Sequence, residues 1–397
     1  MDGITSPKGF IAQGIHCGIR KNKAKLDLTM VKSEYPTTAA GTYTKNTFVA
    51  PPVVVTKKHI ENSNPRAIVV NSGLANACTG NKGYDDALEM ARSTAKALDL
   101  ETEEVVVAST GLIGEYLPME ALKEGIFDIA EKLTRDGHKN AAMAIMTTDT
   151  RPKEVSTSVT IDGKEITIGG MAKGSGMIYP NMATMLSFVT TDCAITKEML
   201  DKVLFYCVDR SYNMITVDGD TSTNDMVIAL ANGAGGNNLI DRENEAFYAF
   251  RDAFLKLNKK LSKEVVTDGE GTTKVIKLTV KGAKEFVDAK KIAMEVLNSN
   301  LVKTAFFGED ANWGRIIMAM GNSGVDFDPD KVCVYLGDVQ VVEKGQGLSF
   351  DEDKAMEVLK NFEVPVVINL ALGEEEATAY GSDLSYEYVR INGEYRT

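Results

Sequence analysis

GMIYPNMATMLSF, residues 176–188, joins a glycine-rich loop to an apolar strand. The loop reaches Pro180, and the small residues Ala183 and Thr184 come directly before the apolar side chains of the predicted strand. A threonine hydroxyl is a weak nucleophile unless a base removes its proton. Thr184 is therefore either an ordinary turn residue or a nucleophile at the mouth of a strand.

A chain break before Thr184 would supply the base that its hydroxyl needs. The α-amine released by the break has a reference pKa of about 7.7–8.0, so a useful fraction of it is neutral near pH 7. The Thr184 hydroxyl can make the break itself by attacking the Ala183 carbonyl, after which the acyl group shifts from nitrogen to oxygen and water hydrolyses the ester. This chemistry needs no histidine, and the chain has only three. The pattern alone leaves both interpretations open.

A second candidate group lies in STGLIGEYLP, residues 109–118. A predicted buried strand ends at Thr110, and Gly111 begins the loop before the next predicted helix. A threonine hydroxyl beside a glycine N–H can donate hydrogen bonds to an oxyanion. An ordinary strand-to-helix turn has the same pattern, so this segment is also ambiguous by itself.

Composition narrows the classes of function. Lys plus Arg number 44 and Asp plus Glu number 56, which gives a formal charge of −12 and argues against nucleic acid or an anionic membrane as partner. The five cysteines never form C-x-x-C, which indicates free thiols in a reducing compartment and no disulfide framework or zinc site. We see no secretory signal pattern and no run of about 18 apolar residues, so we expect a cytoplasmic protein without a membrane span.

Helices and strands are mixed without a strict βαβ alternation, which favours an α+β layered sandwich over a doubly wound sheet. Apolar runs and alternation predict strands, two of them joined in a hairpin at Asp162-Gly163. The predicted strands lie within 25–31, 67–73, 103–110, 155–170, 185–189, 214–217, 274–280, 364–372 and, as an edge strand, 386–397. Helical spacing predicts helices at 84–100, 118–133, 196–210, 244–261 and 351–359.

Three polar or glycine-rich loops do not match ligand-binding motifs. Residues 169–176 lack the G-K-[ST] order of a phosphate-binding loop, and residues 232–238 do not form G-x-G-x-x-G. DGDTSTND, residues 218–225, lacks the glycine and the final glutamate of a calcium loop. A polar turn explains this last segment better, although so many small polar groups together can also line a pocket. We expect no metal and no cofactor.

Taken together, these segments resemble the ornithine acetyltransferase family (glutamate N-acetyltransferase) of arginine biosynthesis over nearly the full chain. The core NMATML is highly specific. The resemblance rests on VNSGLANACTG from Val70, STGLIGEYLPM from Ser109, AIMTTDT from Ala144, MAKGSGMIYPNMATMLSF from Met171, ITVDGDTSTND from Ile215, FGEDANWGRI from Phe307 and the tail VRINGEYRT.

The resemblance implies a precursor that cuts itself between Ala183 and Thr184. The products are an α chain, residues 1–183, and a β chain, residues 184–397, which pack as one intertwined α/β sandwich of the autoprocessing aminopeptidase-like fold. Two such heterodimers usually associate. The implied reaction moves an acetyl group from N-acetylornithine to glutamate through an acetyl-threonine enzyme, and some members of that family also take acetyl from acetyl-CoA.

The resemblance also implies roles for single residues. Thr184 matches the nucleophile, and Thr110 and Gly111 match the pair that forms the oxyanion hole. The substrate-binding positions are matched by Thr147, Lys173, Thr184, Glu270, Asn392 and Thr397. The charges of Lys173 and Glu270 are complementary to those of the substrate, because a lysine can pair with a substrate carboxylate and a glutamate with the cationic amine of ornithine.

Two rival functions come from other classes. An amidohydrolase or aminopeptidase with the same fold and nucleophile would pass the acyl group to water, with no need for glutamate. A non-catalytic amino-acid-binding protein would use GSGMIYPNMAT, residues 174–184, as a ligand loop and would keep its chain intact.

Overall fold

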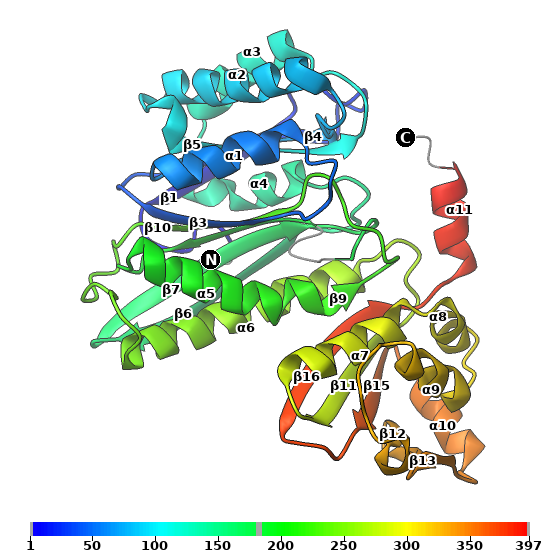
Figure 1. Ribbon diagram of the computed structural model, residues 1–397. Coiled ribbons are helices and arrows are strands. Elements are labelled where there is room, and N and C mark those ends of the chain that lie inside the picture. The colour runs from blue at the N-terminus through cyan, green and yellow to red at the C-terminus, as the bar shows by residue number, and fades with distance from the viewer. Residues whose placement is uncertain (1–2, 180–184, 395–397) are drawn as a thin grey trace.

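The computed structural model describes residues 3–179 and 185–394. Its strands form three sheets, two of them stacked in the upper part of Figure 1 and the third in the lower part. The four-stranded sheet has the order β1 (Phe10–Ile15), β2 (Leu28–Ser33), β4 (Ala67–Leu74) and β5 (Val105–Leu112). The five-stranded sheet has the order β3 (Thr38–Tyr43), β10 (Met226–Ala231), β8 (Leu186–Thr191), β7 (Lys164–Lys173) and β6 (Lys153–Ile161).

Helices cover the outer faces of the two stacked sheets. α2 (Gly80–Leu98) and α3 (Met119–Ala130) pack on the four-stranded sheet, and α5 (Lys197–Asp209) and α6 (Glu245–Thr267) pack on the five-stranded sheet. The core between the sheets also receives side chains from α1 (Pro51–Asn62) and α4 (His138–Ala144). The order of layers is helices, sheet, sheet, helices, which confirms the predicted α+β layered sandwich.

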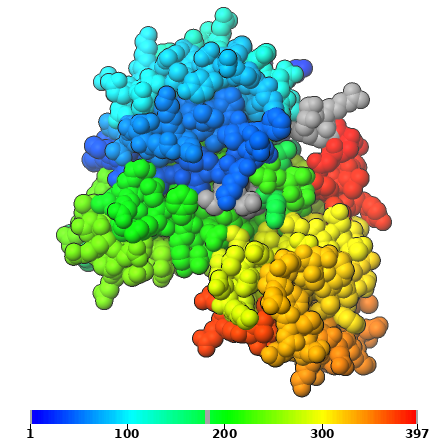
Figure 2. Space-filling model, in the orientation of Figure 1, coloured from blue at the N-terminus to red at the C-terminus, as the bar shows by residue number. Residues whose placement is uncertain are grey.

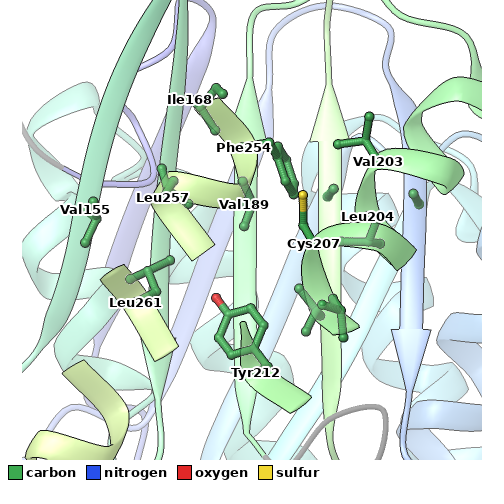
Figure 3. Close-up of a cluster of buried hydrophobic side chains, with 14 of the residues drawn as sticks. Val155, Ile168, Val189, Val203, Leu204, Cys207, Tyr212, Phe254, Leu257 and Leu261 are labelled. Carbon is green, nitrogen blue, oxygen red and sulfur yellow. The ribbon is translucent and has the colours of Figure 1, made fainter. Parts of the chain in front are cut away.

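The helix α6 illustrates how the sequence builds these layers. Its N-cap, Asn244, accepts a hydrogen bond from the Phe247 backbone N–H at 3.0 Å. Apolar residues then recur every three or four positions, so Phe254, Leu257 and Leu261 face the five-stranded sheet (Figure 3). Neither α6 nor any other helix of the described residues is long and apolar enough to cross a membrane.

The third sheet forms a separate lobe (Figure 2), and this lobe has its own apolar core. Its order is β14 (Gln346–Gly347), β13 (Val339–Glu343), β12 (Cys333–Leu336), β15 (Glu363–Asn369), β11 (Val275–Ala283), β16 (Glu375–Ser382) and β9 (Ile215–Thr216). Its helices are α7 (Phe286–Asn298), α8 (Asn300–Phe307), α9 (Trp313–Gly321) and α10 (Glu352–Leu359). The short strand β9 belongs to this sheet although it lies between α5 and β10 in sequence. The chain therefore contributes one strand to the third sheet before it continues into β10 of the five-stranded sheet.

The predicted hairpin is confirmed. Strands β6 and β7 pair antiparallel up to Ile161 and Lys164. The two residues between them, Asp162 and Gly163, have φ of 51° and 71°. Two positive φ values in a two-residue loop match the right-handed twist of the flanking strands, and Asp-Gly is a favoured pair for them.

Several predicted elements differ in extent or burial; for example, the helix predicted at 244–261 continues to Thr267. A half-buried strand is predicted at 25–31, and the structure has β2 there, which begins at Leu28. This strand is buried on both faces, because helices cover one face and the second sheet covers the other. The helix predicted at 84–100 begins earlier, at Gly80.

The edge strand predicted at 386–397 is wrong, because Tyr386–Glu394 form a helix, α11. The Ser385 hydroxyl accepts a hydrogen bond from the Tyr388 backbone N–H at 3.1 Å and so caps the first turn. Arg390 then forms ion pairs with residues three positions before it and four positions after it, a spacing that only a helix brings together. The alternating tyrosines that suggested a strand are half-buried or exposed on this helix.

Candidate active site

A cavity of about 160 Å³ lies where β5, β7 and β8 reach the same end of the stacked sheets. Six predicted site residues line it: Thr110, Gly111, Thr147, Lys173, Glu270 and Asn392. They come from segments that are up to 282 positions apart, since 392 − 110 = 282. The predicted residues Ala183, Thr184 and Thr397 lie outside the described residues.

The Thr110-Gly111 pair is fixed by the parallel pairing of β4 with β5. Gly111 lies opposite Gly73 in this ladder and has φ of 134°, a backbone conformation that favours glycine. A Cβ at Gly111 would lie 2.2 Å from the carbonyl carbon of Gly73, which no side chain can tolerate. The sequence therefore needs glycine at 111, and the cavity is lined by half-buried backbone beside Thr110.

The hydroxyl of Thr110 is oriented by Lys173. The Lys173 ammonium, at the end of β7, donates a hydrogen bond to Thr110 Oγ1 at 3.3 Å. A threonine hydroxyl that accepts from an amine still carries its own hydrogen. Thr110 can therefore donate that hydrogen to a negative oxygen in the cavity.

Lys173 is a buried cation in an otherwise acidic neighbourhood. Burial lowers its pKa from the ordinary lysine value, and nearby Lys153 lowers it further. The carboxylates of Asp149, Asp225 and Glu270 oppose this shift. A ligand carboxylate that entered the cavity would find a partly desolvated ammonium, which favours a strong charge-assisted hydrogen bond.

Glu270 faces the cavity from the loop after α6. Asn392, on α11, donates a hydrogen bond to Glu270 Oε2 at 2.9 Å, so the carboxyl-terminal helix completes the cavity wall. Gly176 makes room for this carboxylate, because a Cβ there would lie 2.4 Å from Glu270 Oε2. A carboxylate held in this way can bind a cationic amine.

Both ends of the segment that carries the predicted nucleophile lie at this cavity. On one side, Asp218 accepts hydrogen bonds from the backbone N–H groups of Met177 at 2.7 Å and Ile178 at 2.8 Å. On the other side, the Met226 backbone N–H donates to the Met185 carbonyl at 3.1 Å, where β8 meets β10. Ile178 and Met185 both line the cavity. Met185 is the residue that directly follows Thr184 in the sequence.

The polar turn before β10 was not assigned to the site by sequence, although its small polar residues suggested a pocket. Ser222 to Asp225 line the cavity. The Asn224 amide donates to the carbonyls of Ala75 at 2.6 Å and Ser109 at 2.9 Å, which ties the residue that follows β4 to a residue within β5. Burial raises the pKa of Asp225 well above its ordinary value, against the opposing effects of Ser222 and Lys173.

The described residues offer neither a histidine base nor a metal centre at the cavity. His59 is a buried structural residue with a ring nitrogen 2.7 Å from the Val105 carbonyl, and His16 and His138 contact Asp27 and Glu154. The described lining contains no histidine. Across residues 3–179 and 185–394, no group of three or more His, Cys, Asp or Glu side chains could hold a metal ion.

Known proteins are similar to this chain in both sequence and fold. The ArgJ family matches residues 11–397. The arginine biosynthesis bifunctional protein ArgJ of Symbiobacterium thermophilum is 52% identical over 396 residues, which cover 100% of this chain and 98% of that protein. The protein of the same name from Thermotoga neapolitana is 50% identical over 398 residues, which cover 98% of this chain and 99% of that protein. The crystal structure of the arginine biosynthesis bifunctional protein argJ from Bacillus halodurans is 40% identical in sequence, with a TM-score of 0.52, and the match covers 53% of this chain and 100% of that one.

The family match and the two sequence matches extend over the motifs on which the predicted resemblance rests and over the residues that line the cavity. The residues with predicted roles that the structure describes converge on that one cavity. The chain therefore belongs to the ArgJ family and is an acyltransferase, as the sequence predicts.

Proposed function

We propose that this protein transfers an acetyl group from N2-acetylornithine to glutamate, which gives ornithine and N-acetylglutamate. The observation that carries the proposal is the convergence on one cavity of Thr110, Gly111, Lys173 and Glu270 with Met185, the residue bonded to Thr184. Such a cavity combines donors for an oxyanion, a cation for a carboxylate and a carboxylate for an amine.

Self-cleavage at Ala183-Thr184 prepares the nucleophile. The cut divides the chain into residues 1–183 and 184–397, and the second piece has 397 − 183 = 214 residues, or about 54% of the chain. The solved Bacillus halodurans chain covers 53% of this chain along its full length, which supports a free-standing piece of that size. The new α-amine of Thr184 then acts as the base for its own hydroxyl.

The transfer has two halves. Thr184 Oγ attacks the acetyl carbonyl of N2-acetylornithine while the Thr184 amine takes the hydroxyl proton, and the Thr110 hydroxyl and Gly111 N–H stabilise the oxyanion. The C–N bond breaks, the leaving nitrogen of ornithine receives the proton, and acetyl-threonine remains. The glutamate amine then attacks this ester and releases N-acetylglutamate together with the free threonine hydroxyl. This order predicts ping-pong kinetics.

Recognition uses the opposite ends of the substrate. Lys173 pairs with the α-carboxylate that N2-acetylornithine and glutamate share. Glu270 pairs with the cationic side-chain amine of ornithine, and Asn392 keeps the Glu270 carboxylate in place. We assign Thr147 and Thr397 to substrate binding as well. The relatives carry the word bifunctional in their name, and this is the reason to test acetyl-CoA as a second acetyl donor.

The proposed pieces form one unit because sheet pairing crosses the cut. The antiparallel pair β7–β8 and the antiparallel pair β3–β10 each join a strand of residues 1–183 to a strand of residues 184–397. Separating the pieces would therefore break the five-stranded sheet. We propose that two such heterodimers associate in the cytoplasm as a heterotetramer.

An acetyl-transfer assay tests this function against its rival. Processed enzyme is incubated with acetyl-labelled N2-acetylornithine with and without glutamate, and the products are separated. We expect labelled N-acetylglutamate, parallel lines in initial-rate plots against both substrates, and loss of activity in Thr184→Ala. Release of free acetate at the same rate without glutamate would instead show an amidohydrolase.

A further inference from the structure

A fully buried lysine lies just behind the cavity. Lys153 begins β6, and its side chain has no exposed surface. Its ammonium donates hydrogen bonds to Asp149 Oδ1 and to Asp268 Oδ2, both at 2.6 Å. The two carboxylates are 0% and 4% exposed, so all three charged groups are withdrawn from water. A buried charge of this kind needs its partners, because breaking such a pair leaves an uncompensated charge.

Asp149 fixes two of the loops that line the cavity. Its Oδ2 accepts a hydrogen bond from the Thr147 backbone N–H at 2.9 Å. Its Oδ1 accepts another from the Gly174 backbone N–H at 2.7 Å, in the peptide group that directly follows Lys173. One carboxylate therefore sets the relative positions of Thr147 and Lys173.

Asp268 connects the same loops to Glu270. Its carboxylate accepts hydrogen bonds from the Thr150 backbone N–H at 3.0 Å and from the Thr150 hydroxyl. Its backbone carbonyl accepts from the Ser175 hydroxyl at 2.6 Å. The Glu270 backbone N–H donates in turn to the Ser175 carbonyl at 3.0 Å.

We propose that Lys153, Asp149 and Asp268 are positioning residues that hold Thr147, Lys173 and Glu270 in the arrangement that binds substrate. None of the three lines the described part of the cavity, so they act on the substrate indirectly, through the loops that they join and through their charges. The inference rests on the proposed function, since it takes those loops to be the ones that bind substrate.

The cluster also affects the pKa of Lys173. The pH dependence of substrate affinity should therefore change in variants of the cluster, whereas a merely structural role would leave it unchanged. The charged groups with the largest effects on Lys173 are Asp149, Asp225 and Glu270, which raise its pKa, and Lys153, which lowers it. Lys153→Met removes a like charge and raises the pKa of Lys173, whereas Asp149→Asn removes an opposite charge and lowers it. Substrate carboxylate binds protonated Lys173, so affinity is lost as the pH rises through that pKa.

The test compares Lys153→Met with wild type and with Lys164→Met, the same substitution at an exposed position of the same hairpin. Folding is checked by thermal unfolding, and cleavage by denaturing mass spectrometry. We expect kcat/KM of cut Lys153→Met for N2-acetylornithine to fall about 10²-fold, because loop displacements of about 1 Å have effects of that size. The rise in KM should account for most of the fall, and Lys164→Met should match wild type.

The pH profile of 1/KM supplies the second readout. Its alkaline limb should move to higher pH in Lys153→Met and to lower pH in Asp149→Asn. If Lys153→Met folds but stays uncut, Asp268→Asn supplies the test instead. Folded, cut Lys153→Met with wild-type kcat/KM and an unmoved limb would overturn it.

A gentler variant covers the case in which Lys153→Met does not fold. Asp268→Asn keeps the Lys153–Asp149 pair and an oxygen for Thr150. We expect it to raise KM and to move the alkaline limb less than Asp149→Asn does, because Asp268 is not among the groups with the largest effects on the pKa of Lys173. An unchanged KM would overturn the proposal. Failure of the proposed function is a different result, since wild type itself would then transfer no acetyl group.

Discussion

Lys173 and Thr110 are joined by a hydrogen bond of 3.3 Å although they belong to different sheets. The bond links the cation that we assign to substrate recognition with the hydroxyl that we assign to the oxyanion hole. Because Lys173 occupies an acceptor position on Thr110 Oγ1, the Thr110 hydrogen is free to point at the reacting oxygen. The residue assigned to recognition and the residue assigned to transition-state stabilisation therefore meet in one contact across the sandwich.

The first prediction concerns Thr110→Val, which removes the donor and keeps the shape of the side chain. We expect kcat to fall by about 10²–10³ with little change in KM, because the lost hydrogen bond matters most in the transition state. Thr42→Val is the matched control, since Thr42 is a buried strand threonine whose hydroxyl has no partner among the described residues. Both are measured on fully cut protein. If kcat of Thr110→Val equals the wild-type value, the assignment of Thr110 to the oxyanion hole is contradicted.

Glu270→Gln should weaken recognition and leave the chemistry intact. The neutral amide no longer pairs with the cationic amine of ornithine, so KM for N2-acetylornithine should rise about tenfold, the effect of roughly 1.4 kcal/mol. Acetyl-enzyme should still form at saturating substrate, as mass spectrometry can show. Glu264→Gln, on the same α6–loop segment but paired with Arg151, serves as the control. Absence of acetyl-enzyme in Glu270→Gln at saturation would contradict the assignment.

Gly111→Ala should destabilise the protein more than Gly114→Ala does. Both glycines have positive φ, 134° and 89°. A Cβ at 111 would collide with the Gly73 backbone, whereas a Cβ at 114 would meet nothing within 4 Å. We expect a loss of about 1 kcal/mol at Gly114 from backbone strain and a larger loss at Gly111. Equal midpoints of urea unfolding for the two variants would contradict the close packing at Gly111.

Asp225 should make stability fall as the pH rises. Burial raises its pKa in the folded protein, so between the unfolded value of about 3.9 and the folded value the folded state binds more protons than the unfolded state. In that window stability decreases with pH. Asp225→Asn should therefore have a higher Tm than wild type at neutral pH, and the difference should shrink toward pH 3. A Tm difference independent of pH would show that Asp225 is not the titrating group.

Local signals predicted most of the sandwich. The Asp162-Gly163 hairpin depends on the turn chemistry of two adjacent residues, and α6 depends on an N-cap and a repeat within one segment. The tail was misassigned because the alternation beginning at Tyr386 resembles a strand, whereas the cap from Ser385 and the charge spacing around Arg390 set the helix.

The candidate site was predictable only in part. The family resemblance named Lys173 and Glu270, and the structure brings both to the cavity. The polar turn at Asn224 was noticed without a role, because its hydrogen bonds to Ala75 and Ser109 span more than 100 positions. Lys153 carried no signal at all. Its partner Asp268 is 115 positions away, and nothing in the local sequence distinguishes a buried lysine from an exposed one.

Denaturing mass spectrometry of the purified protein, before and after incubation with N2-acetylornithine, tests the central claim most directly. The account predicts two fragments for wild type, the larger beginning at Thr184, and a single chain for Thr184→Ala. It also predicts that substrate adds one acetyl group to the fragment that begins at Thr184. Cleavage of Thr184→Ala at the same bond, or an acetyl group on any other fragment, would contradict a self-made threonine nucleophile.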